Sequence, residues 1–282
     1  MKRIIIALCM LYLFGGNLSA KVVLPQILSD HAVLQQQTEV KLWGKAVPNT
    51  TVNVTPSWNN QTITAQSDNE GRWQVSIQTP AADFTPYSIE FSDGEITRIQ
   101  NILIGEVWFC SGQSNMEMPL GGWGKITNYQ KEIAEAGHSN IRLLQIEQIN
   151  STQPETNIKV RNDSWQVCSP ITIPEFSATA YFFGREISEK QNVPVGLIHT
   201  SWGGTNVESW ISGEVLKEMP EFVKTVESIQ KMPGDKKILK AEYLKELTAW
   251  NNRVDEGFAE GKPVRAAASL DDKDWEKYEF PG

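Results

Sequence analysis

The sequence has few of the residues from which metal sites and nucleic-acid surfaces are built. Its 282 residues include three histidines and three cysteines, and no pair of them stands at the spacing typical of metal ligands. Asp and Glu number 34 against 26 Lys and Arg, which gives a net charge of −8, and no basic block occurs. A phosphate backbone is bound by clustered Lys and Arg. We therefore expect no metal, no cofactor and no nucleic-acid partner.

Long hydrophobic runs are also missing, and the nearest to one stands at the N-terminus. A short basic start at Lys2 and Arg3 precedes the apolar stretch Ile4–Phe14 and the small residues around Asn17–Ala20. A stretch of this length is shorter than the roughly 20 residues that span a bilayer. Residues 1–20 are predicted to be a secretory signal peptide rather than a weak membrane anchor. The mature protein would then be exported to the periplasm or the extracellular space, without stable membrane insertion.

Two cysteines remain after this segment, Cys110 and Cys168. In an oxidising compartment they could form one disulfide. Each also lies in an apolar stretch, where cysteine behaves as a small buried hydrophobe. The sequence leaves both alternatives open.

Residues 21–101 have the alternation of half-buried strands. Trp73, Val75 and Ile77, for example, alternate with Gln74 and Ser76, and Gly-, Asn- and Asp-rich turns separate such runs. Short strands at this spacing predict an N-terminal β-sandwich domain. No cluster of titratable residues marks a site in it.

Residues 102–264 have a different pattern, typical of an α/β domain. Strands that are buried on both faces alternate with amphipathic helices, which predicts a parallel sheet with helices on both faces. The expected strands are 102–110, 141–146 and 194–200, and the expected helices are 126–136, 177–190 and two charged pieces within 220–260 that Pro233 and Gly234 separate.

One serine follows the first of these strands in a turn rich in glycine and amides, "FCSGQSNMEMPL" at residues 109–120. Ligands of an open parallel sheet bind beyond the carboxyl ends of its strands, where Ser114 stands. Gly112 permits a sharp turn, and Gln113 and Asn115 can hold it. The α/β-hydrolase elbow G-x-S-x-G is absent because Met116 replaces its second glycine. From these residues alone, a nucleophile and an ordinary capped turn both remain open.

Four segments together resemble the sialate O-acetylesterase family, carbohydrate esterases of the SGNH hydrolase superfamily. They are "IGEVWFCSGQSNMEMPL", "ILSDHAVLQQQTEVKLWGKAVPNTTVNV", "FSATAYFFGREI" and "VPVGLIHTSWGGTNVESW". The resemblance implies a β-sandwich followed by an SGNH-type three-layer α/β/α hydrolase domain. It also implies a carboxylic ester hydrolase that removes O-acetyl groups from sialic acids by serine acyl transfer. The alternatives are an acetylesterase for another acetylated glycan such as xylan, or a non-catalytic carbohydrate-binding protein on this scaffold.

The same resemblance assigns roles to individual residues. Ser114 is the implied nucleophile, and the backbone N–H groups of Ser114, Gly203 and Gly204 are the implied oxyanion hole. The residues implied at the sugar site are Gln113, Asn115, Met116, Trp202, Thr205, Asn206, Glu208 and Trp210.

Two later family blocks are not found in this sequence: a Gln-Gly-Glu followed by Asn, and the Asp-x-x-His that supplies the base. Residues 271–282 resemble the opening of the β-rich domain that interrupts the family's hydrolase domain, so we expect a C-terminally truncated member whose residues 265–282 begin this insertion. The chain alone is then expected to be inactive. His199 is better placed than His31 or His138 to act as a substitute base, but no acidic residue stands at a triad spacing, and a packed histidine is favoured.

Overall fold

The computed structural model describes residues 21–151, 155, 157–254, 258–259, 262–263 and 273. The predicted signal peptide lies outside these residues, as does nearly all of the segment 265–282. The chain divides into two compact units, which are described separately below. Unit 1 takes in the chain up to Ile149 together with Glu155–Ser212, and unit 2 comprises Asn150–Pro154 and Gly213–Gly282.

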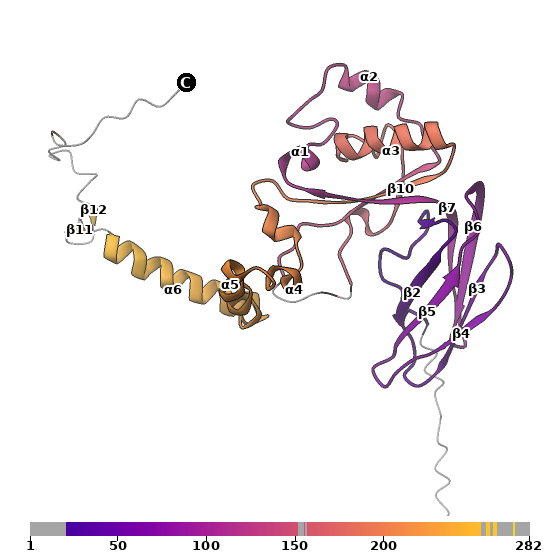
Figure 1. The fold of residues 1–282 in the computed structure, drawn as a ribbon, viewed down its shortest axis with the longest axis horizontal. Coiled ribbons are helices and arrows are strands. Elements are labelled where there is room, and N and C mark those ends of the chain that lie inside the picture. The colour runs from indigo at the N-terminus through magenta and orange to yellow at the C-terminus, as the bar shows by residue number, and fades with distance from the viewer. Residues whose placement is uncertain are drawn as a thin grey trace, which may run out of the picture. The chain divides into compact units, whose positions relative to one another are not determined.

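The first part of unit 1 is built from two β-sheets that enclose an apolar core (Figure 1). β2 pairs antiparallel with β5, while β4, β3, β6 and β7 form consecutive antiparallel pairs with β1 parallel to β7. Inward-facing residues such as Leu42, Val54 and Phe91 are fully buried. The strands are β1 (Val33–Gln35), β2 (Glu39–Lys45), β3 (Thr51–Pro56), β4 (Ile63–Gln66), β5 (Arg72–Gln78), β6 (Asp83–Ser92) and β7 (Ile96–Gly112).

β7 is a continuous strand of 17 residues that joins both parts of unit 1. Its first half pairs with β6, and its second half, Glu106–Gly112, pairs in parallel with β10. The predicted domain boundary between residues 101 and 102 therefore falls in the middle of this strand. The turn that carries Ser114 is attached directly to a strand of the β-sandwich.

The second part of unit 1 extends the sheet in the order β7-β10-β8-β9. β7, β10 and β8 are parallel, and β9 is antiparallel to β8. The predicted α/β fold class is confirmed. The elements are α1 (Ser114–Glu117), α2 (Tyr129–Ala134), β8 (Ile141–Gln145), the short 3-10 helix η1 (Arg161–Asp163), β9 (Gln166–Val167), α3 (Ala178–Gln191), β10 (Val195–Ser201) and the 3-10 helix η2 (Val207–Trp210).

Two predicted helices differ in how well their limits agree with the structure. α3 begins after Ser177, whose side chain accepts a hydrogen bond from the N–H of Ala180, as the N-cap prediction requires. α2 is shorter than the predicted 126–136 because Asn128 has left-handed backbone angles (φ 61°), so that the helix starts only after it.

The helices of unit 1 lie along one face of its parallel strands (Figure 1). In the hydrophobic core between the helices and the sheet, Tyr181 and Ala178 of α3 pack with Leu143 of β8 and Leu197 of β10. On the opposite face the strands are covered by β1 and by a loop, since a Cβ at Gly196 would lie 2.7 Å from Val33 and 3.2 Å from Trp165. At Gly196 this face therefore contacts the β-sandwich side rather than a helix of the described part of unit 1.

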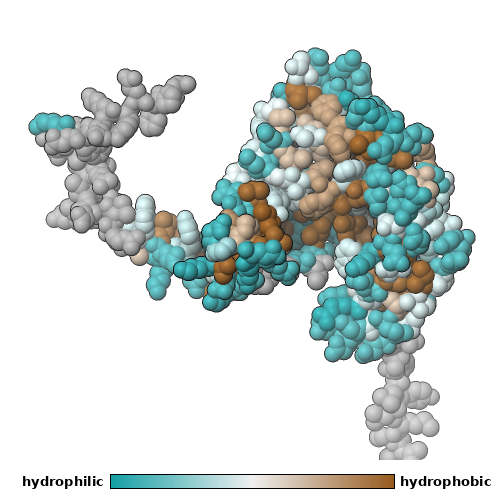
Figure 2. Space-filling model, in the orientation of Figure 1, coloured by the Kyte–Doolittle hydropathy of each residue, from teal (hydrophilic) through white to brown (hydrophobic). Residues whose placement is uncertain are grey.

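Apolar side chains also reach the surface along the sheet next to α3 (Figure 2). Trp108 of β7 is 39% exposed and packs edge-on against Phe183 of α3, with ring centroids 4.8 Å apart. Phe109, its neighbour on β7, is 64% exposed. This half of β7 therefore departs from the prediction of a strand that is buried on both faces.

Unit 2 is helical, with α4 (Gly213–Leu216), α5 (Pro220–Gln230) and α6 (Lys236–Val254) followed by the short strands β11 (Phe258–Ala259) and β12 (Lys262–Pro263). The predicted break at Pro233 and Gly234 is confirmed. Leu216 and Val226 are buried, whereas the described side chains of α6 are mostly exposed. Among the helices that the structure describes, none has the length and apolar character of a membrane span.

Cys110 and Cys168 are free, buried thiols in the core beneath α3. Burial raises the pKa of Cys110 to about 11 and that of Cys168 to about 12. Both side chains therefore behave as small protonated hydrophobes, the second of the two alternatives that the sequence leaves open.

Candidate active site

Ser114 stands at the carboxyl end of β7, as the first residue of α1. Gly112 ends the strand with a φ of 147°, which residues with a Cβ rarely adopt, so the chain turns sharply before the serine. The Ser114 side chain is half-buried. Its hydroxyl lies beyond the carboxyl ends of the parallel strands, where open α/β sheets bind their ligands.

Three donors of the site converge on one oxygen, Oε1 of Gln113. The Ser114 hydroxyl donates to it at 2.8 Å, the Ser114 N–H at 3.2 Å and the Gly204 N–H at 3.4 Å. Two of these donors are backbone amides from separate loops. The turn therefore contains a position where one acceptor oxygen meets a hydroxyl and two N–H groups.

The second loop of the site follows β10. β10 pairs with β7 so that Ser201 stands opposite Gly112, and the N–H of Trp202 then donates to the Gly112 carbonyl at 3.0 Å. This contact holds Gly203 against the serine turn. A Cβ at Gly203 would lie 3.5 Å from Ser114 Oγ and only 2.8 Å from Glu117 Oε2, so an alanine here would require the Glu117 carboxylate or the loop to shift.

The site contains two further polar side chains that were not predicted from the sequence. Glu117 accepts hydrogen bonds, and Gln148 donates them. The Glu117 carboxylate accepts the N–H of Gly203, and Gln148 Nε2 donates to Glu117 at 2.8 Å and to the Ser201 carbonyl at 3.0 Å. Glu117 lies three residues after Ser114, one helical turn away, which is a signal that could have identified it. Gln148 follows β8, whose carboxyl end meets those of β7 and β10.

The implied sugar-site residues after β10 are partly brought together. Thr205 Oγ1 donates to the Trp202 carbonyl at 2.7 Å and accepts the indole N–H of Trp210 at 2.9 Å. The Trp202 side chain is 36% exposed. These contacts join the two tryptophans through Thr205. Asn206 is exposed and Glu208 is half-buried, and both belong to the same segment around η2.

The residues next to Ser114 that the family resemblance implies at the sugar site differ in their exposure and contacts. Asn115 is exposed, and its carbonyl accepts the Thr179 hydroxyl at 2.9 Å. Met116 packs against the core beneath α3, where its sulfur lies 3.6 Å from Ser177 Oγ. Gln113 turns its amide oxygen back onto Ser114. Met116 therefore shapes the turn from within the protein, whereas the exposed Gln113 holds it at the surface.

His199 is buried, with 3% of its surface exposed, and its Nε2 lies 2.7 Å from the Ser201 hydroxyl. Its Nδ1 has no hydrogen-bond partner among the described residues. Burial lowers the pKa of this imidazole to about 4. The ring is thus a packed neutral histidine in the strand below the glycine loop.

We expect the His199 imidazole to make the folded protein less stable in mild acid. Between pH 6.5 and about 4 the unfolded chain binds a proton that the folded protein excludes, so the free energy of unfolding falls as the pH falls. The loss is on the order of 3 kcal/mol across this window and levels off at lower pH. Urea unfolding at a series of pH values measures it.

The variant His199→Gln, which is neutral throughout, should lose this part of the pH dependence. His138→Gln serves as the matched control, since His138 is half-buried beside Tyr181 in the same unit. Carboxylates titrate equally in all three proteins and cancel in the comparison. Identical pH profiles for the wild type and His199→Gln would contradict the prediction.

No group of three or more His, Cys, Asp or Glu side chains suited to hold a metal ion occurs in the part of the chain that the structure describes. The chemistry of the site is that of a hydroxyl, backbone amides and one carboxylate.

Comparison with known proteins finds similarity to carbohydrate esterases. Residues 104–240 match the family model of sialic acid-specific acetylesterases. The chain is 29% identical to human sialate O-acetylesterase over 209 residues, which are 68% of this chain and 39% of that protein. It is also 29% identical to the mouse sialate O-acetylesterase, over 67% of this chain and 37% of that protein.

A solved structure shares the fold as well. The crystal structure of a carbohydrate acetylesterase from Xanthomonas citri superposes with a TM-score of 0.64 at 29% identity, over 71% of this chain and 44% of that one. The predicted resemblance to the sialate O-acetylesterase family is confirmed. The chain spans well under half the length of each of these relatives.

Proposed function

We propose that this chain carries the nucleophile and oxyanion-binding parts of a carbohydrate O-acetylesterase that removes O-acetyl groups from sialic acids. The observation that carries the proposal is the meeting of the Ser114 hydroxyl and the N–H groups of Ser114 and Gly204 at one acceptor oxygen. Acyl transfer needs this combination, because the nucleophile and the donors for the developing negative charge must act on the same carbonyl group.

In the proposed reaction, Ser114 Oγ attacks the carbonyl carbon of the acetyl group and gives up its proton to a base. The carbonyl oxygen becomes an oxyanion, and the N–H groups of Ser114, Gly203 and Gly204 donate to it. The sugar oxygen leaves with a proton, and the acetyl group remains on Ser114. Water then releases acetate and regenerates the hydroxyl.

The acetyl oxygen would take the place that Gln113 Oε1 holds in the ligand-free protein. An amide oxygen at this position keeps the two N–H groups and the hydroxyl hydrogen-bonded until substrate enters. Glu117 plays a comparable role at Gly203, whose N–H must turn from the carboxylate to the substrate, or be shared between them. Gln148 fixes Glu117 and thereby the glycine loop.

None of the described histidines is proposed as this base. His199 is unsuited to the task because its Nε2 is engaged by Ser201 and its ring is buried. The resemblance to the sialate O-acetylesterases implies that the histidine of an Asp-x-x-His supplies it. In-frame continuation of the coding DNA into this block would support the esterase, whereas a stop codon after Gly282 would favour a non-catalytic carbohydrate-binding protein.

Export and substrate complete the proposal. We propose that residues 1–20 direct the protein out of the cytoplasm, where it meets acetylated glycans. The longest polypeptide encoded by the reading frame should release acetate from 9-O-acetylated sialic acid at least about tenfold faster than from acetylated xylan. A single contact that only the preferred substrate makes is enough for a preference of this size. Faster release from xylan would reassign the substrate, and release from neither would contradict the proposed activity.

A further inference from the structure

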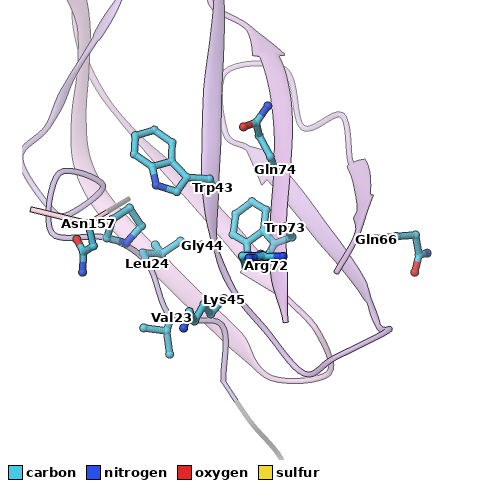
Figure 3. A pocket seen from close by; sticks show the side chains of 11 residues that line it. Val23, Leu24, Trp43, Gly44, Lys45, Gln66, Arg72, Trp73, Gln74 and Asn157 are labelled. Carbon is cyan, nitrogen blue, oxygen red and sulfur yellow. The ribbon is translucent and has the colours of Figure 1, made fainter. Parts of the chain in front are cut away.

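A pocket of about 360 Å³ lies on the β-sandwich, and none of the residues that line it belongs to the serine turn (Figure 3). Its walls come from β2, from β5, from residues 23–25, from Gln66 of β4 and from Asn157. A pocket of this size is within the range that holds a small ligand. Nothing in the proposed reaction uses it.

The register of β2 and β5 explains which side chains face this pocket. Trp43 stands opposite Gln74, and Lys45 opposite Arg72, so these four side chains share one face of the pair. The other face carries the buried Leu42 and turns into the sandwich core. One indole, one amide and two cations are thus presented together on the outer face.

Two indoles border the pocket from opposite faces of the strand pair, Trp43 from the outer face and Trp73 from the core face. Trp43 is half-buried, and Trp73 is 3% exposed behind Gly44, where a Cβ would lie 3.1 Å from its ring. The indole N–H of Trp73 has no acceptor among the described residues, although it is buried. The flat apolar surface that the outer face offers is therefore the Trp43 indole, whereas the Trp73 N–H is buried on the core side.

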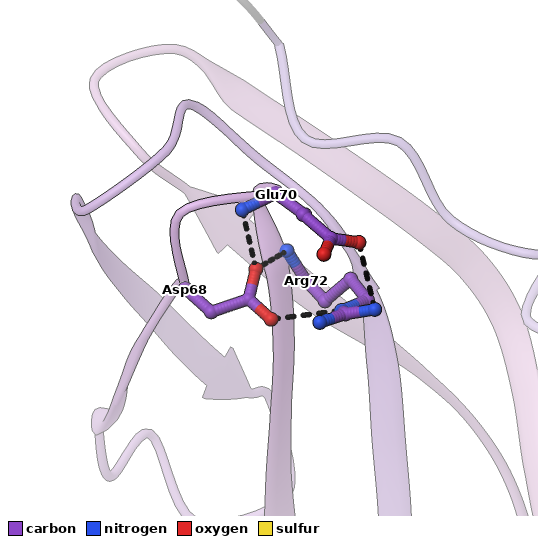
Figure 4. A network of polar contacts seen from close by, with 3 residues as sticks. All are labelled: Asp68, Glu70 and Arg72. Carbon is purple, nitrogen blue, oxygen red and sulfur yellow. Dashed lines mark hydrogen bonds and ion pairs between the residues drawn. The ribbon is translucent and has the colours of Figure 1, made fainter.

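Arg72, which lines the pocket, contacts Asp68 and Glu70 in the turn before β5 (Figure 4). Arg72 Nε donates to Asp68 at 2.8 Å, and its Nη1 lies 2.7 Å from Glu70. Asp68 also accepts the N–H groups of Glu70 and Arg72 at 2.9 and 2.8 Å. Such a preformed turn lowers the entropy cost of binding. The two carboxylates balance the charges of Lys45 and Arg72, so the pocket favours a neutral ligand.

We propose that this pocket binds a neutral pyranose unit of a glycan. The apolar C–H face of a pyranose ring suits the flat indole of Trp43, and its hydroxyl groups both donate and accept, as the amides of Gln74 and Asn157 do. The choice of a glycan rests on the proposed function, whereas the neutrality and the ring stacking follow from the pocket itself. The site would hold the polysaccharide while Ser114 acts on an acetyl group elsewhere.

Saturation-transfer NMR on the full chain tests this, with methyl α-D-galactopyranoside and methyl α-D-glucopyranoside as probes and N-acetylneuraminic acid as the acidic comparison. We expect at least one neutral probe to bind. Trp43→Ala should weaken its binding at least about tenfold, as loss of a central aromatic contact does. Gln74→Ala, which keeps both indoles, should weaken it about fivefold through loss of one hydrogen bond.

Trp58→Ala is the matched control, since Trp58 lies in the same domain outside the pocket and packs against Tyr87. It should leave binding unchanged, as should Ser114→Ala. Absence of transfer to both neutral probes, or transfer that Trp43→Ala and Gln74→Ala leave intact, would overturn the site. Binding of N-acetylneuraminic acid alone, if Trp43→Ala abolishes it, would overturn the neutrality of the pocket. Sugar binding by the longest polypeptide of the reading frame without any release of acetate would contradict only the esterase.

Discussion

Replacing Ser114 by alanine is expected to lower acetate release from 9-O-acetylated sialic acid by at least about 10³-fold, as loss of an acyl-transfer nucleophile does. The hydroxyl that this change removes is the group that lies 2.8 Å from the acceptor position of the site. The amides around it remain, so the variant should still bind substrate. Initial rates in the longest polypeptide expressed from this reading frame measure the effect.

Ser111→Ala is the matched control, because Ser111 precedes the turn on the same strand, β7, and is half-buried like Ser114. It should retain activity within a few-fold of the wild type. Acid quenching during turnover should also trap an acetyl group on the peptide that contains Ser114. Undiminished acetate release by Ser114→Ala would remove the nucleophile assignment and, with it, the proposed mechanism.

Gly203→Ala is expected to lower kcat/KM by about 10²-fold, comparable to the loss of one oxyanion donor. The new methyl group would stand 2.8 Å from Glu117 Oε2 and 3.5 Å from Ser114 Oγ. It must push the carboxylate aside or move the loop away from the serine turn. Either movement would hinder the Gly203 N–H in turning from the Glu117 carboxylate toward the oxyanion of the proposed reaction. Steady-state kinetics on the same substrate measure the change.

Gly137→Ala provides the comparison, since no atom lies within 4 Å of a Cβ built there. It should leave kcat/KM unchanged. Glu117→Ala separates the two causes: a similar loss in this variant means that the glycine acts through the carboxylate, and a small loss means that it acts through its approach to Ser114. Equal activity of Gly203→Ala and Gly137→Ala would show that the loops need not approach so closely.

The regular elements were largely predictable because they depend on local patterns. Alternation identified β5, and the Ser177 cap fixed the start of α3. The limits of α2 were not predictable, since they depend on the left-handed conformation of Asn128. The length of β7 also escaped prediction. The change from alternating to continuous apolar residues predicts a domain boundary. In the structure it lies within β7, where this one strand passes from one hydrophobic core to the other.

The site was predictable in part for a similar reason. Ser114 and the Gly203–Gly204 loop follow two neighbouring parallel strands, so their proximity follows from parallel strand order. The roles of Gln113, Glu117 and Gln148 depend on side-chain directions across three loops, which no spacing in the sequence encodes. The implied ligand contact of Met116 could likewise not be separated from core packing by residue type alone.

The uninterrupted course of β7 has a consequence for any attempt to isolate a smaller catalytic piece. A fragment that starts at residue 102 would keep the serine turn but lose Ile96–Asn101, the half of the strand that anchors it in the sandwich. It would also expose Ile102 and Ile104, which are fully covered in the intact chain. The N-terminal sheets are therefore part of the foundation of the serine turn, and a minimal expression fragment has to include them.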